Sequence, residues 1–376
     1  MSADDLPPEA YAASLAGFEG MTLSRLAALL RHHPPAEAWR VVNREMPTTG
    51  LIARVLSEHS VRTAWRRSAL ARPPERVWAE CQAKGVDVLL PGSARFPALL
   101  AQDILPPPVL FARGDLGLLS GRRVGMVGTR NATAAGKETA RRIAGGLAAA
   151  GVHVVSGLAR GIDGVAHRAV LQAEAEGRPI GVVACGLDVV YPREHRDVWA
   201  AVANCGLLLS ESPPGIGPEP FRFPLRNRII AALSELVVVV ESREKGGSLI
   251  TASEALDRSV PVMAVPGPPT NRASAGANNL LRDGAAPAMS AVEVLDALSL
   301  APTRSATEAW DLRPRPRRDD IAVYDVLRGE PRTIDGVALA AGLTLVDAAM
   351  SLARLEHAGW VGGVDGWFEC VGSPLR

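Results

Sequence analysis

The stretches VGMVG (residues 124–128) and VHVVS (residues 152–156) are short valine-rich runs with a helical pattern between them. Similar apolar runs follow at residues 180–185, 207–210, 236–241 and 260–265. The intervening segments predict helices near residues 136–150, 162–176, 195–204, 225–233 and 248–257. Continuous apolar strands that alternate with helices are typical of a parallel sheet covered on both faces. The sequence therefore predicts an α/β fold with a doubly wound parallel sheet.

The segments on either side of these runs have different patterns. Residues 1–75 read as short helices broken by prolines, which predicts a small helical domain. The sheet domain is expected over 76–298, and it begins with a Pro/Gly-rich connector that reaches Gly121. Residues 299–319 carry an Arg-Pro run without apolar periodicity and predict a linker. Residues 320–376 predict three helices and a short hairpin, the pattern of a winged helix.

Composition restricts the possible partners and compartments. The chain has 376 residues, with 41 Lys+Arg against 40 Asp+Glu and a net charge of +1. A uniformly basic surface for nucleic acid is therefore excluded, and any polyanion site must be local. The four cysteines form no CxxC pair, which argues against zinc and disulfide frameworks and favours a reduced, cytoplasmic location. The apolar runs have the length of strands, so no membrane partner is expected.

Glycines, hydroxyl groups and basic residues follow the predicted strands. In an open α/β sheet such loops gather at one edge, where helix N-termini point backbone N–H groups at anions. This predicts a phosphate-binding site built from residues 128–131, 156–164, 186–188, 245–248, 266–267 and 276–279. The dinucleotide motif G-x-G-x-x-G and the Walker A motif are both missing from the expected positions, so we expect no nucleotide cofactor.

Residues 221–228 interleave aromatic rings with guanidinium groups just before a predicted helix. Arginine pairs with phosphates, and aromatic rings stack on unpaired bases. The segment could therefore bind a single strand. In the alternative interpretation, Phe221 and Phe223 belong to the core, and Arg222, Arg226 and Arg228 are solvated.

The motifs, taken in order, resemble the DprA/Smf family of bacterial DNA-processing proteins. The matching segments are residues 107–110, 113–115, 127–130, 156–163, 186–192, 223–230, 247–252 and 265–267. The resemblance covers roughly residues 85–300. Thr129 and Arg130 match the Gly-Ser-Arg phosphate loop of the family, with Thr in place of Ser.

The resemblance implies an extended Rossmann-like domain that forms a homodimer, binds single-stranded DNA and helps to load the RecA recombinase during natural transformation. It implies no catalysis, cofactor or metal, a SAM or helix-hairpin-helix domain at the N-terminus and a winged helix at the C-terminus. The expected DNA-binding residues are Gly128, Thr129, Arg130, Lys137, Ser156, Gly157, Ala159, Arg160, Gly161, Gly186, Phe223, Arg226, Asn227, Arg228, Lys245, Gly246, Gly247, Ser248, Gly267 and Asn278.

Two alternative functions remain open from the residues alone. Asp163 or Glu254 could serve a nucleotide-processing enzyme similar to phosphoribohydrolases, although the Gly-Gly segment before Glu254 departs from the motif of those enzymes. The chain could also be a scaffold that binds recombinase through an apolar face. From residue 321 to residue 376, four arginines face seven Asp and Glu residues, so we expect this domain to contact protein rather than duplex DNA.

Overall fold

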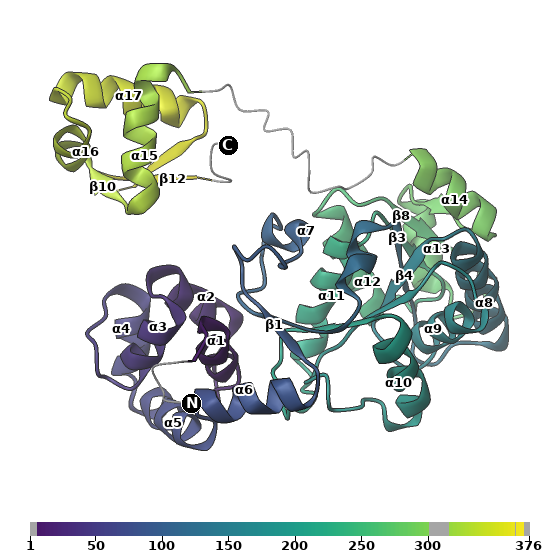
Figure 1. Ribbon diagram of the computed structural model, residues 1–376. Helices are drawn as coiled ribbons and strands as arrows, with labels where there is room; N and C mark the ends of the chain where they lie inside the picture. The colour runs from purple at the N-terminus through teal and green to yellow at the C-terminus, as the bar shows by residue number, and fades with distance from the viewer. Residues whose placement is uncertain (1–5, 301–315, 365, 372–376) are drawn as a thin grey trace. The chain divides into compact units, whose positions relative to one another are not determined.

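A computed structural model describes residues 6–300, 316–364 and 366–371. The chain divides into two compact units, one within residues 1–305 and the other within residues 306–376. The predicted linker over 299–319 lies largely outside the described residues. Figure 1 shows the helices and strands of both units.

The first unit is built on a nine-stranded sheet with the order β1-β2-β6-β5-β4-β3-β7-β8-β9. Strands β3 to β9 run parallel, as the valine-rich runs predict. In register, Gly125 on β3 lies opposite Val155 on β4 and Val237 on β7. The parallel strands are β3 (Arg123–Val127), β4 (His153–Ser156), β5 (Pro179–Val182), β6 (Leu207–Ser210), β7 (Leu236–Val239), β8 (Val262–Ala264) and β9 (Ala286–Pro287).

Helices cover both faces of this sheet, because successive strand residues point to opposite faces and the central strands are buried on both. On one face, Val124 and Met126 pack with α8 (Ala134–Ala149), α9 (Ile162–Gln172) and α14 (Ala291–Leu300). On the other face, Val127 and Val155 belong to the cluster that contains α11 (Arg222–Leu233) and α12 (Gly247–Leu256). Figure 1 shows these two pairs, α8 with α9 and α11 with α12, on opposite sides of the strands. The predicted doubly wound α/β sheet is confirmed.

The segment expected to be a connector contributes two strands to the sheet edge. β1 (Asp87–Leu89) and β2 (Leu110–Gly114) form an antiparallel pair, and β2 pairs antiparallel with β6. Between them lies the short α7 (Ala98–Ala101). The expectation of a plain connector was wrong here because the strands are short and stand among prolines, which mask their apolar pattern.

Six N-terminal helices pack against the sheet in the same unit. Trp65 from these helices and Trp199 from α10 (Arg196–Cys205) belong to one hydrophobic cluster. Lys84 Nζ lies 2.7 Å from a carboxylate oxygen of Asp188 and adds a polar tie. The helices are α1 (Pro8–Ala16), α2 (Leu23–His32), α3 (Pro35–Val42), α4 (Gly50–Ser57), α5 (His59–Ala71) and α6 (Pro74–Ala83).

The second unit has its own core. The rings of Tyr324 and Trp360 meet edge to face with centroids 5.6 Å apart, in a cluster that also contains Leu352. The helices and strands of the second unit are, in chain order, α15 (Ile321–Gly329), β10 (Arg332–Thr333), α16 (Ile334–Ala341), α17 (Leu345–His357), β11 (Val361–Val364) and β12 (Trp367–Cys370). Among the described residues, no single helix has the length and apolar composition to cross a membrane, and the bent pair α16 and α17 meets that test only when both are taken together.

Candidate functional site

The strand order reverses between β3 and β7, and two loops leave the sheet at that point. One loop runs from β3 into α8, and the other runs from β7 into α12. Because α8 and α12 pack on opposite faces of the sheet, the loops diverge and leave a crevice between them. Ligands of open α/β sheets bind in such a crevice.

A cavity of about 340 Å³ occupies this crevice, and we call it the switch-point cavity. Its volume is within the range of roughly 300–1,000 Å³ that is usual for ligand sites. Many residues predicted from the sequence line it together: Gly128, Thr129, Arg130, Ala159, Phe223, Arg226, Asn227, Lys245, Gly246, Gly247 and Ser248.

The loops that follow β3 and β4 touch each other at Gly161. This glycine has φ +75, and a Cβ there would lie 2.2 Å from the carbonyl oxygen of Thr129. The Thr129 N–H in turn donates to the carbonyl oxygen of Glu241 at 2.7 Å. Gly161 therefore permits a close approach that holds Thr129 and Arg130 in place.

The first turn of α8 and the loop before α9 already have carboxylates of this chain bound to them. Glu241 accepts from the N–H of Thr133 at 2.9 Å and from its hydroxyl at 2.6 Å, at the start of α8. Asp163, in the first turn of α9, accepts from the N–H of Gly157 at 3.1 Å. A helix that starts after the first strand usually receives the phosphates of a dinucleotide. Here Glu241 takes that position.

The N-terminus of α12 faces the switch-point cavity. Its N-cap is Gly246, which supplies no side chain to bond the first turn, and Gly246, Gly247 and Ser248 all line the cavity. Lys245 is exposed immediately before them, and Arg130 lines the cavity from the loop after β3. Backbone donors at a helix N-terminus with two flanking cations attract a phosphate group.

Aromatic rings lie beside these cations at the start of α11. The guanidinium carbon of Arg130 is 4.8 Å from the ring centroid of Phe223. The rings of Phe223 and Tyr191 are 5.7 Å apart and tilted by 52°. Phe221 is 56% exposed, and Arg222 lies over its ring. The alternative in which both phenylalanines belong to the core is therefore wrong for Phe221, and Phe223 lines the cavity.

Arg226 and Arg228 are buried, so the alternative interpretation in which they are solvated is wrong. Arg226 is 6% exposed and donates to the carbonyl oxygens of Gly157, at 2.7 Å, and of Val182. Burial lowers the pKa of Arg226 to about 10 and raises that of Asp163, while the opposite charges oppose both shifts. Arg226 therefore connects the loop after β4 to the end of β5 and stabilises the wall of the cavity.

Arg228 is 2% exposed and lies away from the switch-point cavity. Its guanidinium bonds Glu211 and donates to the carbonyl oxygen of Leu105 at 2.8 Å. The two positions lie roughly 200° apart around α11, so each guanidinium meets different partners, and α11 is buried on more than one side. The cations at the rim are therefore fewer than the sequence suggested.

Several other predicted residues lie outside the switch-point cavity. Ser156 is buried and donates to the carbonyl oxygen of Met126 at 2.6 Å. The amide of Asn278 exchanges two hydrogen bonds with the backbone of Gly267, at 2.9 Å and 3.1 Å. These residues shape the loops. Also outside the cavity lining are Lys137, exposed on α8, Gly161 in its loop, and Gly186, whose N–H donates to the carbonyl oxygen of Ile216 at 2.8 Å.

A second cavity of about 660 Å³ adjoins the first, and we call it the outer cavity. Both cavities are lined by Arg130, Asn131, Ala159 and Phe223. The outer cavity is further lined by Gly157, Arg160, Tyr191, Arg193 and Glu194, among others. Tyr191 and, in the switch-point cavity, Arg243 were not predicted from the sequence as binding residues. Arg243 lies close to Lys245 in the same loop, and this position beside a predicted binding residue could have indicated it.

The two carboxyl groups that an enzyme could use both lie beside arginines of this chain, although Asp163 also lines the switch-point cavity. Glu254 accepts from the guanidinium of Arg258 at 2.5 Å and does not line the switch-point cavity. Asp163 is buried beside Arg226. Burial also raises the pKa of the Cys185 thiol to about 12. In the described parts of the chain, no group of three His, Cys, Asp or Glu residues could hold a metal ion. The phosphoribohydrolase-like alternative is not favoured.

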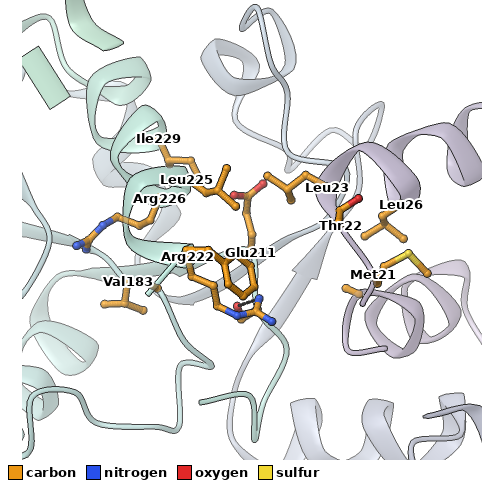
Figure 2. Close-up of a pocket in the computed structure, with 14 residues that line it drawn as sticks. Met21, Thr22, Leu23, Leu26, Val183, Glu211, Arg222, Leu225, Arg226 and Ile229 are labelled. Carbon is orange, nitrogen blue, oxygen red and sulfur yellow. Dashed lines mark hydrogen bonds between the residues drawn. The ribbon is translucent and has the colours of Figure 1, made fainter. Parts of the chain in front are cut away.

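A mostly apolar cavity lies on the other side of α11, between this helix and α2. Figure 2 shows Met21, Leu23 and Leu26 facing Leu225 and Ile229 across it. Glu211 also lines this cavity, and burial raises its pKa to about 7 although Arg228 opposes the shift. Arg222 and Arg226 also line this cavity, but both guanidinium groups already bond acceptors of this chain. The mostly apolar lining with a buried carboxyl group therefore does not suit a phosphate.

Comparison with known proteins identifies a family. The family model for DNA recombination-mediator protein A matches residues 87–299. DNA processing protein DprA of Bacillus subtilis is 37% identical over 282 residues, which cover 74% of this chain and 94% of that protein. Protein Smf of Escherichia coli is 36% identical over 288 residues, with 74% of this chain and 76% of that protein covered.

Solved structures agree with the sequence matches. DNA processing protein A from Streptococcus pneumoniae superimposes with a TM-score of 0.63 at 29% identity, over 77% of this chain and 98% of that one. DNA processing protein A from Helicobacter pylori, described for its single-stranded DNA binding mode, superimposes with a TM-score of 0.50 at 30% identity, over 57% of this chain and 95% of that one. The chain therefore belongs to the DNA recombination-mediator protein A family, also known as DprA/Smf.

Proposed function

We propose that the protein binds single-stranded DNA in the switch-point cavity and acts, without catalysis or a cofactor, as a recombination mediator in the cytoplasm. The observation that carries this proposal is the meeting of three features in one cavity. They are the N-terminus of α12, the cations Arg130 and Lys245, and the ring of Phe223. Phosphates bind the first two, and an unpaired base stacks on the third. The Helicobacter pylori relative, described for binding single-stranded DNA, supports the same ligand.

The finer parts of the proposal rest on family membership. They are a homodimer, the delivery of single-stranded DNA to RecA, and a role in natural transformation. We also propose the domain limits 1–75, 76–298, 299–319 and 320–376. A SAM or helix-hairpin-helix identity for the first domain is supported by its short helices, and a winged-helix identity for the last by its order of helices and strands.

The site is tested by fluorescence anisotropy with labelled oligo-dT. We expect Arg130→Ala to weaken binding and to lower the slope of log K against log salt by about one, because one phosphate contact is lost. Arg142→Ala removes the same charge from an exposed position on α8 that lines neither cavity, so it should leave binding nearly unchanged. Equal affinities of wild type and Arg130→Ala would contradict the site.

A further inference from the structure

The outer cavity has the composition of a second nucleotide subsite. Two walls carry its chemistry. An aromatic wall is formed by Tyr191 and Phe223, and a basic wall by Arg160 and Arg193. The one acidic side chain in the lining is Glu194. The inference from this cavity rests on the proposed function and extends it beyond the switch-point cavity.

Tyr191 offers the accessible ring surface of the aromatic wall. It is 41% exposed, whereas Phe223 is half-buried and has the guanidinium of Arg130 over its ring. The 52° tilt between the two rings shows that they are not stacked face to face. A base could therefore lie on Tyr191 without displacing a parallel ring. Stacking of this kind tolerates any base, because each base has a π face.

Arg160 forms an exposed ion pair with Glu194, which a phosphate could replace. Its guanidinium bonds Glu194, and the two side chains are 62% and 47% exposed. Exposed ion pairs of this kind contribute little to stability, because water screens both charges. A DNA phosphate can accept two parallel hydrogen bonds from a guanidinium and also releases counterions when it is bound. Glu194 therefore competes with a phosphate for Arg160.

The two cavities are continuous with each other at Phe223 and Arg130, which line both. A strand that leaves the switch-point cavity over Phe223 enters the outer cavity next. We propose that the outer cavity is a second nucleotide subsite, in which Tyr191 stacks a base of single-stranded DNA and Arg160 exchanges Glu194 for a phosphate.

The stacking half of the proposal is tested with Tyr191→Ala and the matched variant Tyr191→Phe, which keeps the ring. Each is titrated with oligo-dT and with an abasic oligonucleotide of equal length. We expect Tyr191→Ala to weaken oligo-dT binding by roughly 5-fold to 150-fold, the range for one stacked base. Tyr191→Phe should bind like wild type, and abasic binding should be the same for all three proteins, since no base is present to stack.

The charge half of the proposal is tested with Glu194→Gln. This change removes the competitor of Arg160, so affinity should rise for oligo-dT and for the abasic strand alike. The salt slope should be unchanged or steeper, and Arg160→Ala should lower it by about one. In an Arg160→Ala background, Glu194→Gln should have no effect beyond the small general gain from one fewer negative charge. An equal gain in both backgrounds would show that Glu194 acts as a distant charge, and would overturn the exchange.

A photo-crosslink keeps the test decisive if Tyr191→Ala fails to fold. Wild-type protein is irradiated with an oligo-dT in which 5-iodouracil replaces thymine, and the adducts are mapped by mass spectrometry. An adduct at Tyr191 supports the subsite, whereas adducts restricted to the switch-point cavity overturn it.

The outcomes for the two proposals are distinguishable. Loss in Arg130→Ala with wild-type binding in Tyr191→Ala would overturn the second subsite and leave the proposed function standing. A wild-type protein that does not bind oligo-dT would overturn the proposed function itself.

Discussion

At the scale of single residues, the interior of the sheet domain holds charged and titratable groups that brace the site. Arg226 stays charged near neutral pH because its pKa of about 10 is well above that range. It lies between the loop at Gly157 and the end of β5 at Val182. An uncompensated buried charge is costly. Loss of Asp163 or of these carbonyl contacts would therefore lower the stability of the fold more than it would weaken DNA binding.

His167 gives the fold a pH dependence of known sign. The residue is fully buried on α9, and burial lowers its pKa from 6.5 to about 3. The folded protein therefore keeps the ring neutral, whereas the unfolded chain takes up a proton near pH 6.5. The contribution to stability is complete above pH 6.5 and is lost as the pH falls toward 3.

We expect the free energy of unfolding of wild type to decrease between pH 6.5 and pH 4 more steeply than that of His167→Leu. The difference in slope should be on the order of 1 kcal/mol per pH unit. Urea unfolding at a series of pH values measures both proteins. Parallel curves would show that His167 is protonated in the folded state as readily as in the unfolded chain.

At the scale of elements, the start of α8 depends on a carboxylate from the loop that follows β7. Glu241 lies just past β7, is 5% exposed and binds Thr133, the N-cap of α8. A negative charge at this end also interacts favourably with the helix dipole. Glu241 thereby joins the start of α8 to the loop that follows β7.

We expect Glu241→Gln to lower the free energy of unfolding by about 1–3 kcal/mol, because the amide offers an uncharged acceptor and places a donor against donors. Glu244→Gln makes the same change at an exposed position of the same loop and should be nearly neutral. Chemical unfolding of both variants measures the difference. A Glu241→Gln protein as stable as Glu244→Gln would show that the cap contributes little.

Alternation of valine runs and helices predicted the parallel part of the sheet, since that period is local in the sequence. The edge strands β1 and β2 were missed because they are short and stand among prolines, and because β2 pairs with β6, far along the chain. The orientation of α11 was also missed. Its apolar and basic residues alternate too closely to mark a buried face, so only packing shows that Arg226 points inward and that Phe221 does not. Gly128 and Lys245 lie far apart in the sequence, and the strand order brings them to one cavity.

At the scale of the whole molecule, the two compact units differ in charge. The unit after residue 305 carries an excess of acidic residues from 321 onward. Negative side chains repel the negative phosphates of DNA. The switch-point and outer cavities are both lined by residues of the first unit. DNA binding is therefore expected to be a property of the first unit.

A chain that ends at residue 305 is expected to bind oligo-dT as tightly as the full chain or slightly more tightly, because the removed residues carry eight arginines against eleven Asp and Glu residues and are net negative. Anisotropy titrations of both chains at two salt concentrations test this, with circular dichroism as the control for folding. A large loss of affinity on truncation would show that the second unit contacts the strand directly.

One helix, α11, presents a ring to the cavities through Phe223 and sends two guanidinium groups into the interior through Arg226 and Arg228. In a genetic screen, alleles at all three positions would be scored alike, as defective in DNA handling. Only alleles at Phe223 should be separation-of-function alleles, with normal protein abundance and weakened binding. Alleles at Arg226 and Arg228 should instead reduce the amount of folded protein, so abundance measurements must accompany any reading of their phenotypes.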